Sequence, residues 1–170
     1  MAAQADDSLC WFVARTRHGA ELGVRNRLVT LGVEHFIPTV RTRGRRGNTV
    51  ERPVINCLLF IHATQAEALA LIHERGLKAD YLFDCATRRL MVVPDKEMDD
   101  FRRVFDVSIE EGGLIDQPLE VGERVRVIEG PLQGVEGFVF ELLGKYYVVV
   151  SLLNFLWAKA QVPRAWLQKL

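Results

Sequence analysis

The side chains able to perform acid–base or nucleophilic chemistry are scattered along this chain. None of its four histidines lies at a motif spacing from a serine, cysteine or carboxylate that would predict a catalytic site. The cysteines Cys10, Cys57 and Cys85 are odd in number and include no Cys-x-x-Cys pair, which argues against a disulfide framework or a zinc site. We therefore expect no enzyme, no metal and no cofactor, and we expect the three cysteines to be buried free thiols.

Arginine is the residue type that gathers in one place. The segment 41–52 carries Arg41, Arg43, Arg45, Arg46 and Arg52, with glycines and an asparagine in between that favour a hairpin tip. Guanidinium groups suit phosphates and guanine edges better than lysine does. Two interpretations stay open: a solvated, mobile hairpin tip, or a finger that contacts nucleic acid phosphates.

The net charge of zero hides an uneven layout. Lysine plus arginine and aspartate plus glutamate number 22 each over 170 residues, and 49% of the residues are hydrophobic, so the chain can bury a core. Residues 1–60 nevertheless carry nine basic and five acidic side chains (+4), residues 95–123 three and ten (−7), and residues 124–170 six and three (+3). We expect weak binding to free nucleic acid.

A glycine pattern marks the second half. Glu129, Gly130, Gly134 and Gly137, flanked by valines, suit a tight strand-loop-strand turn in which φ is positive or side chains would collide. Because no helix and no Lys-Ser/Thr pair follow, a phosphate cradle is not indicated. A hairpin without any ligand is the simpler interpretation.

The elements that position these residues fall into two modules. Residues 11–16, 35–43, 54–62, 81–85 and 90–93 have strand character, the last two as a strand pair. Helices are predicted after Gly19, after the capping box Thr64/Glu67 and after Pro94. This order predicts an α+β domain with one antiparallel sheet and helices on one side.

The second module is all-β. Residues 108–118 lose periodicity and have linker composition, and the short strands predicted over 124–127, 135–142, 146–150 and 156–162 suit a small closed SH3-like barrel. We expect domains at 9–107 and 119–170 joined by a linker at 108–118. The start of the chain is polar, and no apolar run approaches the ~20 residues of a membrane span, so we expect a cytoplasmic, monomeric protein without membrane contact.

The glycine pattern resembles the KOW motif, and residues further upstream resemble a NusG N-terminal (NGN) domain. These are Trp11-Phe12-Val13, Phe36-Ile37-Pro38, Arg52-Pro53 with Leu58-Leu59-Phe60-Ile61, and Val93-Pro94-Asp95. The resemblance covers Trp11 to Leu170. It implies an elongation factor whose N-terminal domain binds the clamp helices and gate loop of RNA polymerase.

Two departures from the housekeeping pattern sharpen the resemblance. The arginines of 41–52 and the replacement of Pro-Gly-Tyr by Ile55-Asn56-Cys57 are more similar to specialised paralogues of the UpxY type, which antiterminate capsular polysaccharide operons. The resemblance then implies that the arginines contact non-template DNA or nascent leader RNA. It leaves the operon and the recognised element open.

The resemblance also implies two protein-binding surfaces. The first is an apolar face of the N-terminal domain for the polymerase, with the candidates Trp11, Phe12, Phe36, Pro38, Leu59, Phe60, Tyr81 and Phe83. Most of these also suit a core, and alternation places Trp11 and Phe12 on opposite sides of their strand. The second is Phe155, which matches the family's contact with ribosomal protein S10 or Rho; barrel packing is the alternative.

The predicted function is antitermination and processive elongation over a long capsular or exopolysaccharide operon. A general NusG role in elongation and Rho-dependent termination is the alternative within the family. A KOW-containing protein that binds RNA or the ribosome without the polymerase is the alternative outside it. Whether the two domains dock in the free protein also stays open.

Overall fold

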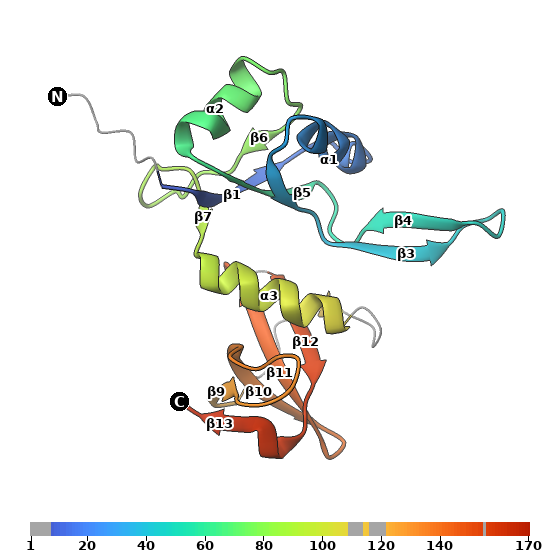
Figure 1. The fold of residues 1–170 in the computed structure, drawn as a ribbon, viewed down its shortest axis with the longest axis vertical. Helices are drawn as coiled ribbons and strands as arrows, with labels where there is room; N and C mark the ends of the chain where they lie inside the picture. Colours follow the sequence, from blue (N-terminus) through green and yellow to red (C-terminus); the bar gives the residue numbers. More distant parts are fainter. Residues whose placement is uncertain (1–7, 109–113, 116–121, 155) are drawn as a thin grey trace. The chain divides into compact units, whose positions relative to one another are not determined.

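The computed structural model describes residues 8–108, 114–115, 122–154 and 156–170, with the side chains of residues 114–115 excepted. It divides into two compact units, residues 1–94 and 95–170, and each is described by itself. Figure 1 shows the elements of both. No helix among the described residues is long and apolar enough to cross a membrane.

The first unit is built on an antiparallel sheet in the order β2-β5-β1-β6, with β7 also paired to β1. The strands are β1 (Cys10–Arg15), β2 (Glu34–Phe36), β5 (Leu58–Ala63), β6 (Asp80–Tyr81) and β7 (Val92–Val93). Its helices are α1 (Glu21–Thr30) and α2 (Gln65–His73). The predicted capping box at α2 is confirmed, since Thr64 Oγ1 accepts from the Glu67 amide and the Glu67 carboxylate accepts from the Thr64 amide.

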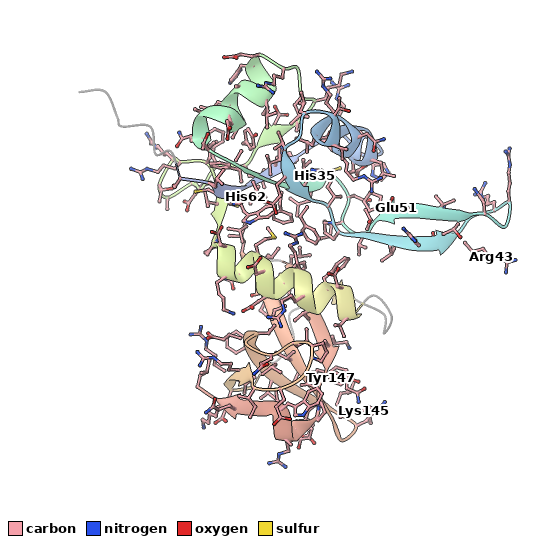
Figure 2. The ribbon with its side chains drawn as sticks, viewed as in Figure 1. His35, Arg43, Glu51, His62, Lys145 and Tyr147 are labelled. Carbon is pink, nitrogen blue, oxygen red and sulfur yellow. The ribbon has the colours of Figure 1, made fainter. Side chains whose placement is uncertain are left out.

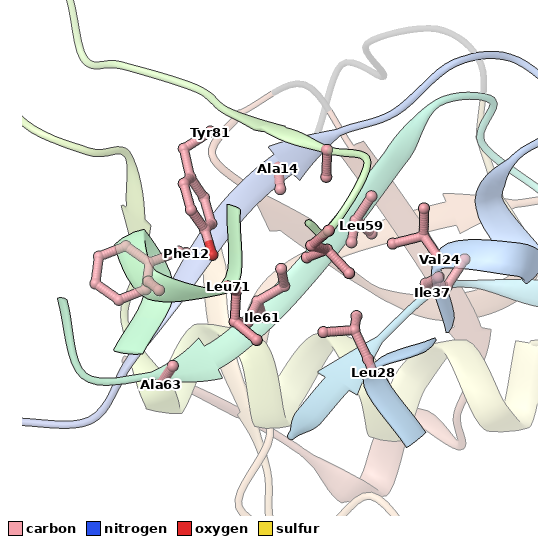
Figure 3. Close-up of a cluster of buried hydrophobic side chains, with 13 residues drawn as sticks. Phe12, Ala14, Val24, Leu28, Ile37, Leu59, Ile61, Ala63, Leu71 and Tyr81 are labelled. Atoms are coloured by element: carbon pink, nitrogen blue, oxygen red, sulfur yellow. The ribbon is translucent and has the colours of Figure 1, made fainter. Parts of the chain in front are cut away.

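One face of this sheet carries the core between strands and helices. Phe12 and Ala14 of β1 pair with Ile61 and Leu59 of β5, so all four point to the same face. Leu28 packs with them in the same buried cluster, which Figure 3 shows. The period-2 strands and the helical apolar stripes thus meet as the sequence predicts.

Two of the predicted strands are interrupted. The run 35–43 divides into β2 and β3 (Thr39–Arg43), with Ile37 and Pro38 buried between them. The run 54–62 begins as a turn, because Cys57 has φ 67°, a left-handed conformation that cannot continue a strand. The strand itself starts at Leu58. The strand pair predicted over 81–85 and 90–93 is reduced to one bridge, Phe83 with Leu90.

β3 and β4 (Thr49–Pro53) form a separate two-stranded ribbon that extends beyond the sheet in Figure 1. Its tip closes through hydrogen bonds from the Gly44 amide to Asn48 O (2.7 Å) and from the Gly47 amide to Gly44 O (3.0 Å). Gly47 has φ 77°, which a side chain would strain. The predicted hairpin tip is confirmed.

The second unit consists of α3 (Asp95–Ser108) and an antiparallel sheet in the order β13-β9-β10-β11-β12-β8. Its strands are β8 (Leu114–Ile115), β9 (Arg124–Val127), β10 (Glu136–Leu142), β11 (Lys145–Leu152), β12 (Leu156–Gln161) and β13 (Leu167–Lys169), the last after the short helix η2 (Arg164–Trp166). The pairings among the described residues leave β8 and β13 as the two edges. The sheet is therefore open, whereas a closed barrel was predicted.

Two further expectations need adjustment. Leu114 and Ile115, inside the predicted linker 108–118, pair with Ala158 and Trp157 as β8, while residues 109–113 and 116–118 lie outside the described residues.

The prediction of buried cysteines is wrong: Cys10 and Cys57 are half-buried and Cys85 is exposed. Cys85 lies in the turn after Asp84, whose carboxylate accepts from the Ala86 and Thr87 amides, so its position is set by a surface turn.

Candidate binding surfaces

The ribbon of residues 39–53, here called the arginine hairpin, carries all five of the predicted nucleic-acid-binding arginines. Arg41, Arg43, Arg45, Arg46 and Arg52 are exposed. Among the described residues, no ion pair engages Arg43, Arg45, Arg46 or Arg52. Their charge is thus available to a ligand.

The register divides these arginines between two faces. Arg41 pairs with Glu51 and Arg43 with Thr49, so both arginines lie on the face of the ribbon that carries Glu51. Arg52 pairs with Val40 on the opposite face. Arg45 and Arg46 lie in the tip that the hydrogen bonds among Gly44, Gly47 and Asn48 close. Figure 2 shows Arg43 beside this tip, at the opposite end of the ribbon from Glu51. In the sequence the five arginines form one cluster, but in the structure they lie at three places: on one face of the ribbon, on the opposite face and at the tip.

A carboxylate holds the base of the arginine hairpin. Oε1 of Glu51 accepts from Arg25 Nη1 of α1 at 2.6 Å and from Thr39 Oγ1 at 2.7 Å. The hydrogen bonds from Arg25 and then Thr39 lower the pKa of Glu51 despite partial burial. The charge of Arg25 therefore serves to position the base of the arginine hairpin. The exposed arginines of the hairpin itself remain available for contacts with a ligand. The sequence analysis missed this role of Arg25 and Glu51, and no local motif indicates it.

The predicted polymerase-binding face is largely buried. Trp11, Phe12, Leu59 and Phe60 are at most 3% exposed. Pro38 and Tyr81 are also buried, and burial raises the pKa of the Tyr81 phenol. Phe36 is half-buried and lies against Phe60 with ring centroids 6.1 Å apart. Phe83, at 60% exposed, is the one member of this set with most of its surface in solvent.

Trp11 and His62 show how the second face of the sheet is filled. They are cross-strand partners, and their rings stack with centroids 4.6 Å apart. Nδ1 of His62 lies 2.7 Å from Oε2 of Glu34 in β2. Figure 2 labels His62 together with His35, whose Nδ1 contacts Val33 O at 2.8 Å. The expectation that Trp11 and Phe12 face opposite sides is confirmed, yet both are buried.

The four residues of the predicted KOW motif lie in and beside the loop between β9 and β10, here called the glycine loop (residues 128–135). Gly130 and Gly134 have φ 80° and 85°, and Glu129 is exposed. A Cβ on Gly137 would lie 2.4 Å from Val149 O of β11. The pattern is thus explained by backbone conformation at two glycines and by close strand packing at the third.

The carbonyls of the glycine loop bind α3. Arg103 Nη2 donates to Pro131 O (2.9 Å) and Gln133 O (2.8 Å), and Lys96 Nζ donates to Gly134 O (3.0 Å). In return, Asp100 Oδ2 accepts from the Glu136 amide at 3.1 Å. From the sequence alone, the charged residues of α3 are explained only by their favourable interaction with the helix ends. Their function as a polar clamp on the loop was missed because the partners lie 28 to 38 residues away along the chain.

A second exposed feature of the C-terminal sheet is the turn between β10 and β11. Leu143 is 93% exposed with φ 50°, and Leu142 is 43% exposed. Nearby, Lys159 lies over the ring of Tyr147 at 5.1 Å, and Figure 2 labels Tyr147 and Lys145 on this sheet. The predicted partner contact Phe155 lies outside the described residues, and its neighbour Asn154 is exposed.

Comparison with known proteins identifies the family. The model of the family described as "Transcription termination factor nusG" matches residues 9–102, more than half of the chain. A solved structure described as "Domain interaction in Thermotoga maritima NusG" aligns with a TM-score of 0.49 at 17% identity, over 96% of this chain and 98% of that one. No curated protein matches. The chain belongs to the NusG family of transcription factors.

Proposed function

We propose that this protein binds elongating RNA polymerase and makes it antiterminating and processive over a long operon for capsular or exopolysaccharide biosynthesis. The observation that carries the proposal is the arginine hairpin: five exposed arginines on a ribbon whose base is tied to α1 through Glu51 and Arg25. A positioned ribbon that exposes five arginines supports contact with phosphates.

Within this proposal, the N-terminal domain contacts the clamp helices and gate loop. Phe83 and the half-buried Phe36 are the best placed of the apolar candidates, because the others have almost no exposed surface. The domain limits 9–107 and 119–170 are part of the proposal, as is a KOW role for the C-terminal sheet toward ribosomal protein S10 or Rho.

The arginine hairpin contacts non-template DNA or nascent leader RNA in this proposal. Because the chain as a whole is neutral, protein contacts to the polymerase must bring the arginines to the strand at a high effective concentration. Arg45 and Arg46 at the tip reach farthest, and Arg41 and Arg43 follow along one face.

The test combines two measurements on one variant. Arg45→Glu with Arg46→Glu is expected to abolish run-through of a terminator in the target operon while capture of core RNA polymerase stays unchanged. Arg75→Glu with Lys78→Glu, two exposed residues after α2, is the control with the same change in net charge. Full run-through activity in the Arg45/Arg46 variant would contradict the proposal.

The second candidate is a general NusG role in Rho-dependent termination, which the description of the matching family model favours. Run-through assays with and without Rho separate the two functions: the proposed factor raises run-through in both, and a termination factor lowers it when Rho is present. Tight binding to structured RNA without any capture of polymerase would exclude both and favour an RNA-binding role.

A further inference from the structure

Three side chains with different metal-binding atoms meet at the start of α1. They are His18 in the loop before the helix, Glu21 at its first residue and Cys57 in the turn before β5. One donor atom of each lies within 4.8 Å of the other two. In the described part of the chain this is the one group of three histidine, cysteine or acidic residues that meets this spacing.

The backbone holds Cys57 in an unfavourable conformation at this place. Its φ of 67° is rare for a residue with a side chain. Its amide donates to Glu21 Oε1 at 2.8 Å, and its carbonyl accepts from the Thr16 amide at 2.8 Å. Its two backbone groups are thus tied to the first residue of α1 and to the segment before that helix, and the thiol is held beside the Glu21 carboxylate.

Glu21 is held in a fixed position beside the thiol. It is 2% exposed, and its Oε1 accepts a hydrogen bond from the Cys57 amide at 2.8 Å. Carboxylate oxygen is one of the usual ligand types of zinc, so Glu21 adds a buried donor atom whose position a backbone amide fixes.

His18 is the residue of the trio whose side chain can move to bring the donor atoms closer together. It is exposed and precedes Gly19, whose φ of 80° turns the chain into α1. Tetrahedral zinc with bonds of about 2.0–2.3 Å places its ligand atoms about 3.3–3.8 Å apart, so the trio has to contract by roughly 1 Å. An exposed imidazole beside a glycine can make that movement by rotating its side chain.

We propose that His18, Glu21 and Cys57 bind one zinc ion, with water in the fourth position. The donor set of one thiolate, one imidazole and one carboxylate suits zinc, and calcium and magnesium are disfavoured because they prefer oxygen ligands. The ion joins the start of α1 to the turn before β5. This site is independent of the proposed transcriptional function, and sequence spacing conceals it because Cys57 is 36 residues from Glu21.

The experiment titrates the full-length, tag-free protein with zinc in competition with a chromogenic chelator, and with cobalt as a spectroscopic probe. The expected result is one zinc per chain, and a cobalt complex with tetrahedral visible absorption and a thiolate charge-transfer band. Cys57→Gly removes the thiol and adopts positive φ without strain, so the variant stays folded. It should lose the charge-transfer band and weaken zinc binding more than about tenfold, the loss caused even by removing groups that only orient a ligand.

His18→Ala tests the second ligand at an exposed position, where folding is not at stake. It should weaken zinc binding by a similar factor. Cys85→Ser and His73→Ala are the matched controls, because both residues are exposed and distant in sequence from the trio. Absence of zinc binding by the unmodified protein would overturn the proposal. Equal losses in the controls and the ligand variants would overturn it as well.

Discussion

Arg25 Nη1 in α1 lies 2.6 Å from Glu51 Oε1 in β4, and this ion pair ties the base of the arginine hairpin to a helix. The two side chains are 27% and 35% exposed, so water screens the pair in part. Thr39 adds a hydrogen bond at 2.7 Å to the same oxygen. Positioning of the hairpin therefore depends on one charged carboxylate.

Glu51→Gln keeps the size of this side chain and removes its charge. We expect a loss of about 0.5–1 kcal/mol in the free energy of unfolding at pH 7. The folded-state pKa of Glu51 is lowered, first by the Arg25 hydrogen bond, so its contribution is present above the unfolded pKa of about 4.3 and is lost as pH falls through the folded value. Urea unfolding at pH 7 and near pH 3 checks this prediction, and an equal deficit at both would contradict it.

The tip arginines predict a salt dependence in the polymerase complex. If Arg45 and Arg46 each neutralise a phosphate, the slope of log affinity against log salt should fall in magnitude by about 1.4–1.8 when both are replaced by alanine. Measurements at several salt concentrations with the Arg75/Lys78 alanine pair as control test this expectation. An unchanged slope would leave the tip without a phosphate contact.

Two phenylalanines distinguish packing from surface in the first unit. Phe60 is fully buried, so Phe60→Ala should lower the free energy of unfolding by about 3–5 kcal/mol. Phe83 is 60% exposed, and Phe83→Ala should change it by less than about 0.5 kcal/mol. Chemical denaturation measures both. Weakened polymerase capture by the stable Phe83 variant would identify a contact, whereas weakened capture by the Phe60 variant would report on folding.

Two glycines predict substitutions of opposite sign. A Cβ at Gly137 would approach Val149 O to 2.4 Å, so Gly137→Ala has to displace backbone in the C-terminal sheet and should destabilise by about 1–3 kcal/mol. Gly23 lies in α1, and the space that a Cβ would occupy there is open. Gly23→Ala should therefore raise the free energy of unfolding by about 0.5–1 kcal/mol. Thermal or urea unfolding of both variants provides the check. Destabilisation by Gly23→Ala would contradict the helix account.

The clamp of α3 on the glycine loop rests on Asp100. This residue is 5% exposed, and its Oδ2 accepts from the Glu136 amide and lies 2.5 Å from Lys96 Nζ. Asp100→Ala leaves that amide without its acceptor and should cost about 1–3 kcal/mol. The neighbouring Asp99 is exposed, so Asp99→Ala serves as the control. Faster hydrogen exchange at residues 131–136 in the Asp100 variant alone would locate the effect.

The local sequence pattern was sufficient to predict individual helix caps, strands and turns. The capping box at Thr64 and Glu67, the alternation of β9 and the hairpin tip at residues 44–48 depend on neighbours within a few residues, so the chain encodes them directly. Family membership also follows from ordered local motifs, and the family model confirms it. The predicted start of the strand at residue 54 was wrong, because the positive φ of Cys57 delays the strand until Leu58.

The tertiary structure decided what those elements do. Local pattern marks Trp11, Phe60 and Phe83 alike as apolar aromatics, and only packing makes the first two core and leaves the third exposed. The pairs of Arg25 with Glu51 and of Asp100 with the Glu136 amide join residues 26 and 36 positions apart, and the trio at the start of α1 spans 39. Such contacts depend on how whole elements pack, and no local spacing records that packing.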